Sequence, residues 1–261
     1  MTGGIRFENG RAYEHMMGKW SRLVGEDFLS WMAPAPGLDW LDIGCGNGAF
    51  TELLGERCAP KSLVGVDPSE AQLDYARSRR IPDARFEQCG AMALPFADAS
   101  FDAAVMALVL FFVSDPARGV EEMTRVVKPG GTVCAYVWDA LEPGGFPLSM
   151  MQEELKSLAT MPILPPRADI SPARALAQLW LEAGLVEVKI ATFVVSRTFQ
   201  DFDDFWSTVE IALRMGDSTR ELPSEKRTEL RDRLVQRLPT QGDGSLVHTA
   251  RANAVVGKVR Q

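Results

Sequence analysis

The sequence predicts an α/β fold: one domain over residues 1–261, with a doubly wound, seven-stranded, mostly parallel sheet, helices on both faces and an added helical cap. Apolar runs of strand length alternate with amphipathic helical patterns along much of the chain. This alternation requires right-handed crossovers, which produce parallel strands. Of the 261 residues, 46% are hydrophobic and 24% are charged, as is typical of a soluble globular protein.

Residues 1–37 are expected to form an N-terminal helical lid. Apolar side chains at helical spacing, among them Val24 and Phe28, predict a helix over 11–32. The segment 34–37 contains two prolines and a glycine, so it ends this helix.

The segment 38–138 is expected to form the ligand-binding core. The helix after its second strand begins with a capping box, in which the Ser69 hydroxyl and the Gln72 side chain bond to free backbone amides. A later helix begins with Asp115 as its N-cap and Pro116 as its first residue. The predicted strands are 38–43, 62–66, 84–88, 102–107 and 132–138, with helices at 49–57, at 69–79 and from 116.

The second half of the chain is expected to supply two more strands and a helical cap over the substrate. The cap comes from insertions at 139–170 and 200–240. Between them, a helix that ends at Gly184 precedes a sixth strand over 186–195. The last strand lies within 246–259, and the sequence leaves the direction of the last two strands open.

The composition argues against several kinds of site and partner. A net charge of −7 repels phosphate backbones, so a small molecule is expected as the partner and a nucleic acid is not. The four cysteines form no C-x-x-C pair and there are only two histidines, so no metal site is expected. The cysteines are single and no apolar leader is found, which predicts a cytoplasmic protein. No run reaches about 18 apolar residues, so no membrane span is expected. The protein is expected to be a monomer or a homodimer.

Three glycines at alternate positions carry the chemical signal. Gly44, Gly46 and Gly48 follow a predicted strand and open a helix, where backbone amides favour an anion. Asp67 ends the next strand, and a carboxylate at that place can accept both hydroxyls of a ribose. The combination indicates a nucleoside-binding crevice. A tight turn without a ligand would also use these glycines, and a helix cap would also use Asp67.

The motifs resemble those of the class I methyltransferases, and among these the methyltransferase type 11 branch that includes the ubiquinone/menaquinone-biosynthesis C-methyltransferases. The glycine motif at 41–48 is similar to the family's first motif, and 64–69 is similar to its acidic motif. The stretches 91–102 and 127–131 resemble its fourth- and fifth-strand motifs. The family's order and spacing hold from about Trp40 to Trp138.

The resemblance implies a Rossmann-like fold, S-adenosylmethionine as cofactor and S-adenosylhomocysteine as product. The glycines would line the methionine end, Asp67 would hold the ribose, and an N-terminal aromatic would close over the cofactor. The implied cofactor residues are Tyr13, Asp42, Gly44, Cys45, Gly46, Gly48, Asp67, Pro68, Gln72, Gly90, Ala91, Met92, Ala107 and Leu108.

Two departures from the family bear on affinity and catalysis. Gly90 stands where the family usually has an acidic residue that bonds to the adenine, and the histidine often found near Phe111 is missing. Holding the acceptor in line with the methyl group can supply much of the catalysis, and a base is needed only for a protonated nucleophile. The sequence offers no convincing base, so no catalytic residue is assigned.

Aromatic residues outside the motifs are expected to line a pocket for a small, partly apolar acceptor. Some of them equally fit a plain helical core stripe. His15 is the histidine expected nearest the site, and His248 is expected to be structural. The proposed pocket residues are Trp20, Phe111, Phe112, Trp138, Phe146 and Phe205.

Two other functions are weighed against methyl transfer. A non-catalytic S-adenosylmethionine-binding protein would fit the missing histidine and Gly90. A nicotinamide-dependent oxidoreductase is disfavoured because Ala49 or Thr51 replaces the last glycine of Gly-x-Gly-x-x-Gly and no Tyr-x-x-x-Lys pair is found. The acceptor and the atom methylated do not follow from the sequence.

Overall fold

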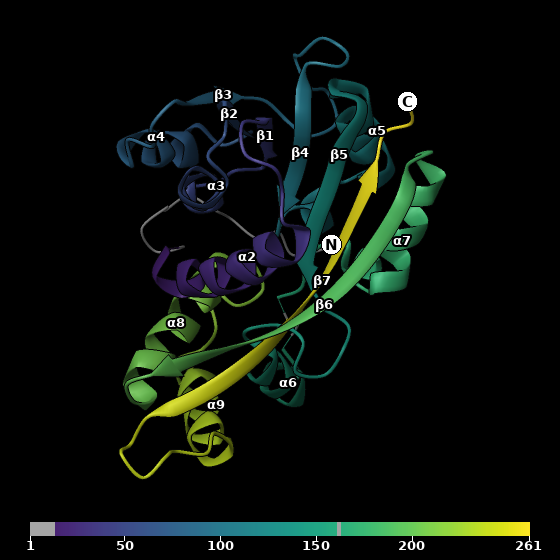
Figure 1. Cartoon of the computed structure of the whole chain (residues 1–261). Helices are drawn as coiled ribbons and strands as arrows, with labels where there is room; N and C mark the ends of the chain where they lie inside the picture. Colours follow the sequence, from purple (N-terminus) through teal and green to yellow (C-terminus); the bar gives the residue numbers. More distant parts are fainter. Residues whose placement is uncertain (1–13, 161–162) are drawn as a thin grey trace.

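A seven-stranded sheet in the order β3-β2-β1-β4-β5-β7-β6 forms the centre of the computed structural model, which describes residues 14–160 and 163–261 (Figure 1). Strands β1 to β5 are parallel, and β7 runs antiparallel to both β5 and β6. The predicted α/β sheet is therefore confirmed, and the direction of its last two strands is settled. The strands are β1 (Asp39–Ile43), β2 (Ser62–Asp67), β3 (Ala84–Gln88), β4 (Phe101–Ala107), β5 (Val127–Trp138), β6 (Val186–Phe199) and β7 (Leu246–Lys258).

Helices cover both faces of the sheet because strands are added on both sides of β1. The connection from β1 to β2 moves one way along the sheet and that from β4 to β5 moves the other way, so right-handed crossovers place α3 and α5 on opposite faces. Helix α2 packs with α3, and α7 packs with α5. These helices are α2 (Lys19–Met32), α3 (Ala49–Cys58), α4 (Glu70–Ser78), α5 (Pro116–Val126) and α7 (Ala173–Glu182).

The remaining α-helices gather at one end of the sheet, where the paired strands β6 and β7 extend beyond the other strands (Figure 1). Helix α6 packs on α9, and α8 packs on η1 and β6. No helix in the described part of the chain is both long and apolar enough to cross a membrane. These elements are η1 (Glu14–Gly18), η2 (Leu110–Phe112), α6 (Ser149–Ser157), η3 (Ala168–Ile170), α8 (Phe202–Met215) and α9 (Ser224–Arg237).

The structure corrects several local predictions. The first described residues form a π-helix, η1, before α2 begins, whereas one continuous helix was expected. Strand β5 begins at Val127, because that residue already pairs with Phe101 across an irregularity in the ladder. The side chain of Ser69 makes no capping hydrogen bond, and the Ser69 amide, which was expected to bond to the Gln72 side chain, donates to the Asp67 carboxylate. The N-cap at Asp115 is confirmed, with its side chain accepting from the Arg118 amide.

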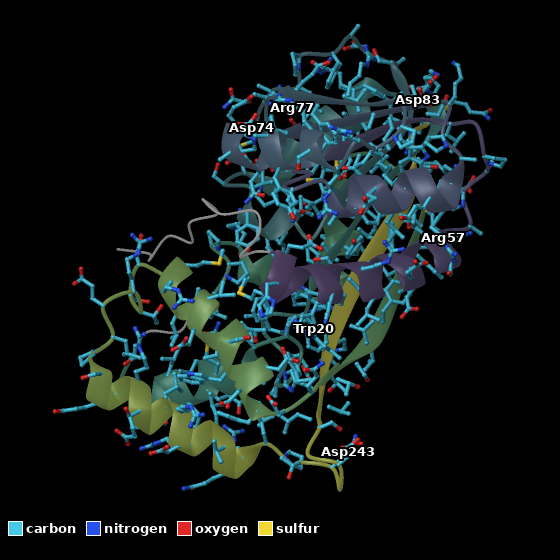
Figure 2. The ribbon with its side chains drawn as sticks, turned by 90° about the vertical axis from the view of Figure 1, so that its left-hand side faces the viewer. Trp20, Arg57, Asp74, Arg77, Asp83 and Asp243 are labelled. Carbon is cyan, nitrogen blue, oxygen red and sulfur yellow. The ribbon has the colours of Figure 1, made fainter. Side chains whose placement is uncertain are left out.

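The hydrophobic core fills both faces of the sheet. Strand β4 has almost no exposed residue, as expected for a strand covered on both sides. Figure 2 shows Trp20 inside the molecule, whereas the charged side chains of Asp74, Arg77 and Asp83 lie on its outer surface. The carboxyl ends of the parallel strands meet at the same edge, so ligand-binding residues from different strands can come together there.

Candidate binding site at the carboxyl edge of the sheet

A cavity of about 650 Å³ opens at the carboxyl ends of β1, β2 and β4. Asp42 and Gly48 do not line it, and Tyr13 falls outside the described residues. Sequence reasoning missed Ser21, Asn47, Phe50 and Tyr136, which are brought to the cavity by the fold. The predicted residues that line it are Gly44, Cys45, Gly46, Asp67, Pro68, Gln72, Gly90, Ala91, Met92, Ala107, Leu108 and Phe112.

The glycine-rich loop is fixed against the end of β2. The amides of Gly44 and Cys45 both donate to the Val66 carbonyl, at 2.7 and 2.9 Å. Gly44 and Gly46 have φ values of +72° and +52°, which strongly favour glycine. A Cβ on Gly44 would overlap the Val109 side chain, whereas a Cβ on Gly46 would meet no atom within 4 Å. The loop therefore leaves open space at Gly46, on the cavity side.

Asp67 presents a fixed carboxylate to the cavity at the end of β2. One oxygen accepts from the Gly46 amide at 3.0 Å and the other from the Ser69 amide at 2.8 Å. Burial raises the pKa of this carboxyl group, although the two backbone hydrogen bonds act in the opposite direction. A carboxylate has about four acceptor positions, so each oxygen keeps capacity for a ligand hydroxyl.

Asp42 lies behind the glycine-rich loop and is fully buried. One of its oxygens accepts from the Thr51 hydroxyl at 2.6 Å, and the other has no partner among the described residues. Burial raises the pKa of Asp42 to about 7. The carboxyl group thus connects β1 to the first turn of α3.

A charged network joins η1 to the glycine-rich loop. Glu14 accepts from the side-chain amide of Asn47 at 2.7 Å and from Arg79 at 2.6 Å. Arg79 also donates to the Asn47 carbonyl at 2.7 Å and to Glu52 at 2.8 Å. Sequence reasoning missed this network because its members come from η1, the loop, α3 and the end of α4.

A second, smaller cavity of about 60 Å³ adjoins the first. Leu108 and Phe112 line both cavities. Among the described residues, Gln152 is the only one with a polar amide or charged group that lines the second cavity. Its amide is bonded to the backbone of Ile163, which also lines the cavity, at 2.5 and 2.7 Å. The other lining residues are Met16, Met17, Phe111, Trp138, Phe146, Leu148, Met151, Ala212 and Met215.

The predicted acceptor residues divide into two groups. Phe111, Phe112, Trp138 and Phe146 line the second cavity. Trp20 and Phe205 do not line it, and both are almost fully buried. Trp20 packs edge-on against Trp138 at 6.3 Å, and Phe205 packs edge-on against Phe199 at 5.3 Å. These two belong to the core stripes of their helices.

The two cavities contain few groups that could move a proton. Among the described residues that line them, Asp67 is the only carboxylate, and there is no histidine, lysine or arginine. Burial raises the pKa of the Cys45 thiol well above its usual range, so it stays protonated. His15 is exposed, its ring contacts the Ser207 hydroxyl at 3.0 Å, and neither of these two residues lines either cavity. The described residues hold no cluster of three potential metal ligands.

Comparisons with known proteins agree with this geometry. A family model described as a methyltransferase domain matches residues 41–135. A demethylmenaquinone methyltransferase of Lactococcus lactis subsp. lactis is 31% identical over 178 residues, which cover 60% of this chain and 69% of that protein. Another, of Renibacterium salmoninarum, is 38% identical over 113 residues, or 43% of this chain, and the chain spans only 45% of its length. The YcgJ protein of Bacillus subtilis shares the fold, with a TM-score of 0.62, 18% identity and coverage of 91% of this chain and 99% of that one.

Proposed function

We propose that this chain, which belongs to the class I S-adenosylmethionine-dependent methyltransferases of the ubiquinone/menaquinone C-methyltransferase-like branch, moves the sulfonium methyl group of S-adenosylmethionine to a small, largely apolar acceptor. The resemblance found in the sequence motifs is thereby confirmed at the level of the family. The observation that carries the proposal is the junction of two unlike cavities, one with a polar loop and a carboxylate, the other apolar, at Leu108 and Phe112.

The first cavity fits the cofactor that the family uses. The free acceptor capacity of Asp67 suits the two ribose hydroxyls. The open space at Gly46 and at Gly90, where an added Cβ would meet no atom within 4 Å, leaves room for the methionine end and the adenine. With Gly90 in place of an acidic residue, backbone groups near Ala91 would recognise the adenine amino group. When bound, S-adenosylmethionine supplies an electrophilic methyl group on a good leaving group.

The chain contributes mainly by positioning the reactants and excluding water. Leu108 has a φ of +62°, a left-handed conformation that is rare for leucine, and its amide donates to the Tyr136 carbonyl at 2.8 Å. This fixed turn sets the boundary between the two cavities. Correct alignment of acceptor and methyl group can supply about 7–11 kcal/mol of the barrier reduction.

The acceptor must be nucleophilic without help from a base on the described part of the chain, because neither cavity offers one beyond Asp67. A neutral amine, an acidic phenol or an acidic C–H compound with an apolar body meets this requirement. The net charge of −7 also favours a small molecule over a nucleic acid. A cytoplasmic location fits the four free cysteines. The protein would act there as a monomer or a homodimer.

Turnover tests this proposal. The native protein, incubated with S-adenosylmethionine and a panel of naphthols, hydroxyquinones and apolar amines, should form S-adenosylhomocysteine together with one methylated product. Matched hydrophilic acceptors of the same nucleophilic class should react more slowly. Cofactor binding without any acceptor-dependent product would instead favour a non-catalytic binding protein, and binding of NADH in place of S-adenosylmethionine would favour an oxidoreductase.

A further inference from the structure

Arg197 of β6 is a buried cation that has no paired anion within residues 14–160 and 163–261. Its side chain is only 3% exposed, and no described carboxylate forms an ion pair with it. Burial lowers the pKa of the guanidinium, which Asp204 partly offsets. The cross-strand neighbour, His248, is also buried, and burial lowers its pKa, which disfavours a second positive charge beside the guanidinium. An apolar residue at such a place usually costs no stability or even adds some, so stability alone does not account for this arginine.

The buried guanidinium contacts the backbone of η1. One nitrogen donates to the Met16 carbonyl at 2.9 Å, and another lies 3.5 Å from the His15 carbonyl. The central carbon of the guanidinium lies over the Phe199 ring, 4.2 Å from its centre, so a cation–π contact adds to the hold on this side chain. Arginine presents several donors in a rigid fork, so one side chain can hold two successive carbonyls.

The element held by Arg197 lines the second cavity and contacts the glycine-rich loop that lines the first. At its start, Glu14 contacts Asn47 of the glycine-rich loop. Farther along, Met16 and Met17 line the second cavity. Short π-helices are rare and occur frequently at functional sites, where they place successive side chains in directions that an α-helix would not allow.

We propose that Arg197 is a positioning residue, which holds η1 by its carbonyl groups and thereby fixes Met16 and Met17 as one wall of the second cavity. The inference rests on the proposed function only in identifying that cavity as the acceptor site. Methionine side chains adapt readily to different shapes. A fixed backbone therefore decides which acceptor shapes this wall accommodates.

Xenon provides a probe that needs no knowledge of the acceptor, because dry apolar cavities bind it. The native protein, labelled with ¹³C at the methionine methyl groups, should show xenon-dependent shifts at Met16, Met17, Met151 and Met215. The first two belong to η1, and the others belong to α6 and α8. The ratio of the xenon responses of Met16 and Met17 to those of Met151 and Met215 therefore distinguishes a displaced η1 from the loss of the whole cavity.

In the Arg197→Leu variant, the responses of Met16 and Met17 should fall about fivefold relative to those of Met151 and Met215, which corresponds to one lost buried hydrogen bond. Arg197→Lys, which keeps the charge and a single donor, should give an intermediate ratio and serves if the leucine variant does not fold. Arg231→Leu is the matched control, because Arg231 stacks on Phe202 at the surface. It should give the native ratio.

An unchanged ratio in whichever Arg197 variant folds would overturn the inference, as would a native protein that shows no xenon response at these methionines. The proposed function fails separately, if the native protein does not bind S-adenosylmethionine. With an acceptor identified, the Arg197 variants should raise the KM for the acceptor more than the KM for the cofactor. A purely structural role would not produce that difference.

Discussion

Two glycines of one loop should respond differently to the same substitution. Gly44→Ala and Gly46→Ala both place a Cβ on a residue in the left-handed region, which costs about 1–2 kcal/mol. At Gly44 the new methyl group also overlaps Val109, a β-branched side chain that cannot rotate away. That overlap adds about 1–3 kcal/mol. The free energy of unfolding should therefore fall by about 2–5 kcal/mol in Gly44→Ala and by only about 1–2 kcal/mol in Gly46→Ala.

Among molecules that remain folded, Gly46→Ala should lose more affinity for the cofactor than Gly44→Ala. A methyl group on Gly46 enters open space of the first cavity, so the affinity for S-adenosylmethionine should fall roughly ten- to a hundredfold. Urea unfolding followed by circular dichroism measures the stabilities, and calorimetric titration measures the affinities. Equal destabilisation of the two variants, or native affinity in Gly46→Ala, would refute this account of the loop.

Two further predictions concern the carboxyl groups around the loop. Because burial raises the pKa of Asp42 to about 7, its protonated form stabilises the native state at low pH, and that contribution is lost as the pH rises from about 4 through 7. Asp42→Asn should therefore gain about 2–3 kcal/mol relative to the native protein between pH 5 and pH 8 in urea unfolding, whereas a constant offset would contradict the assignment. Glu14→Gln breaks a partly exposed ion pair and should cost less than about 1 kcal/mol of stability. It should nevertheless speed the dissociation of S-adenosylmethionine in stopped-flow measurements, and Glu56→Gln, which breaks the exposed pair with Arg22, should leave that rate unchanged.

The sheet and the glycine-rich loop could be predicted because their signals are local in the sequence. The buried strands are short, mostly apolar stretches, and Gly44, Gly46 and Gly48 carry their backbone requirement in their own residue type. The boundaries that failed depend on distant pairing. Strand β5 begins at Val127 because of its partner in β4, and β6 continues to Phe199 because it pairs with the start of β7.

The second cavity was only partly predictable, because its wall comes from η1, α6 and α8 as well as from residues near β4 and β5. Phe111 and Phe112 could be proposed because they stand near the place where the family that the sequence resembles often has a histidine. Phe146 and Phe205 look alike in the sequence, yet one lines the cavity and the other is buried in the core. The periodicity of a helix shows which face is covered, and it cannot distinguish a covering ligand from a covering strand.

Calorimetric titration with S-adenosylmethionine, on the native protein and on Asp67→Ala, shows whether the first cavity binds the cofactor through this carboxylate. Asp74→Ala is the matched control, since Asp74 lies exposed on α4. The native protein and the control should bind in the micromolar range, and Asp67→Ala should bind at least about tenfold more weakly, because it loses the acceptor for the ribose hydroxyls. No binding by the native protein at millimolar cofactor, or equal binding by all three proteins, would contradict this expectation.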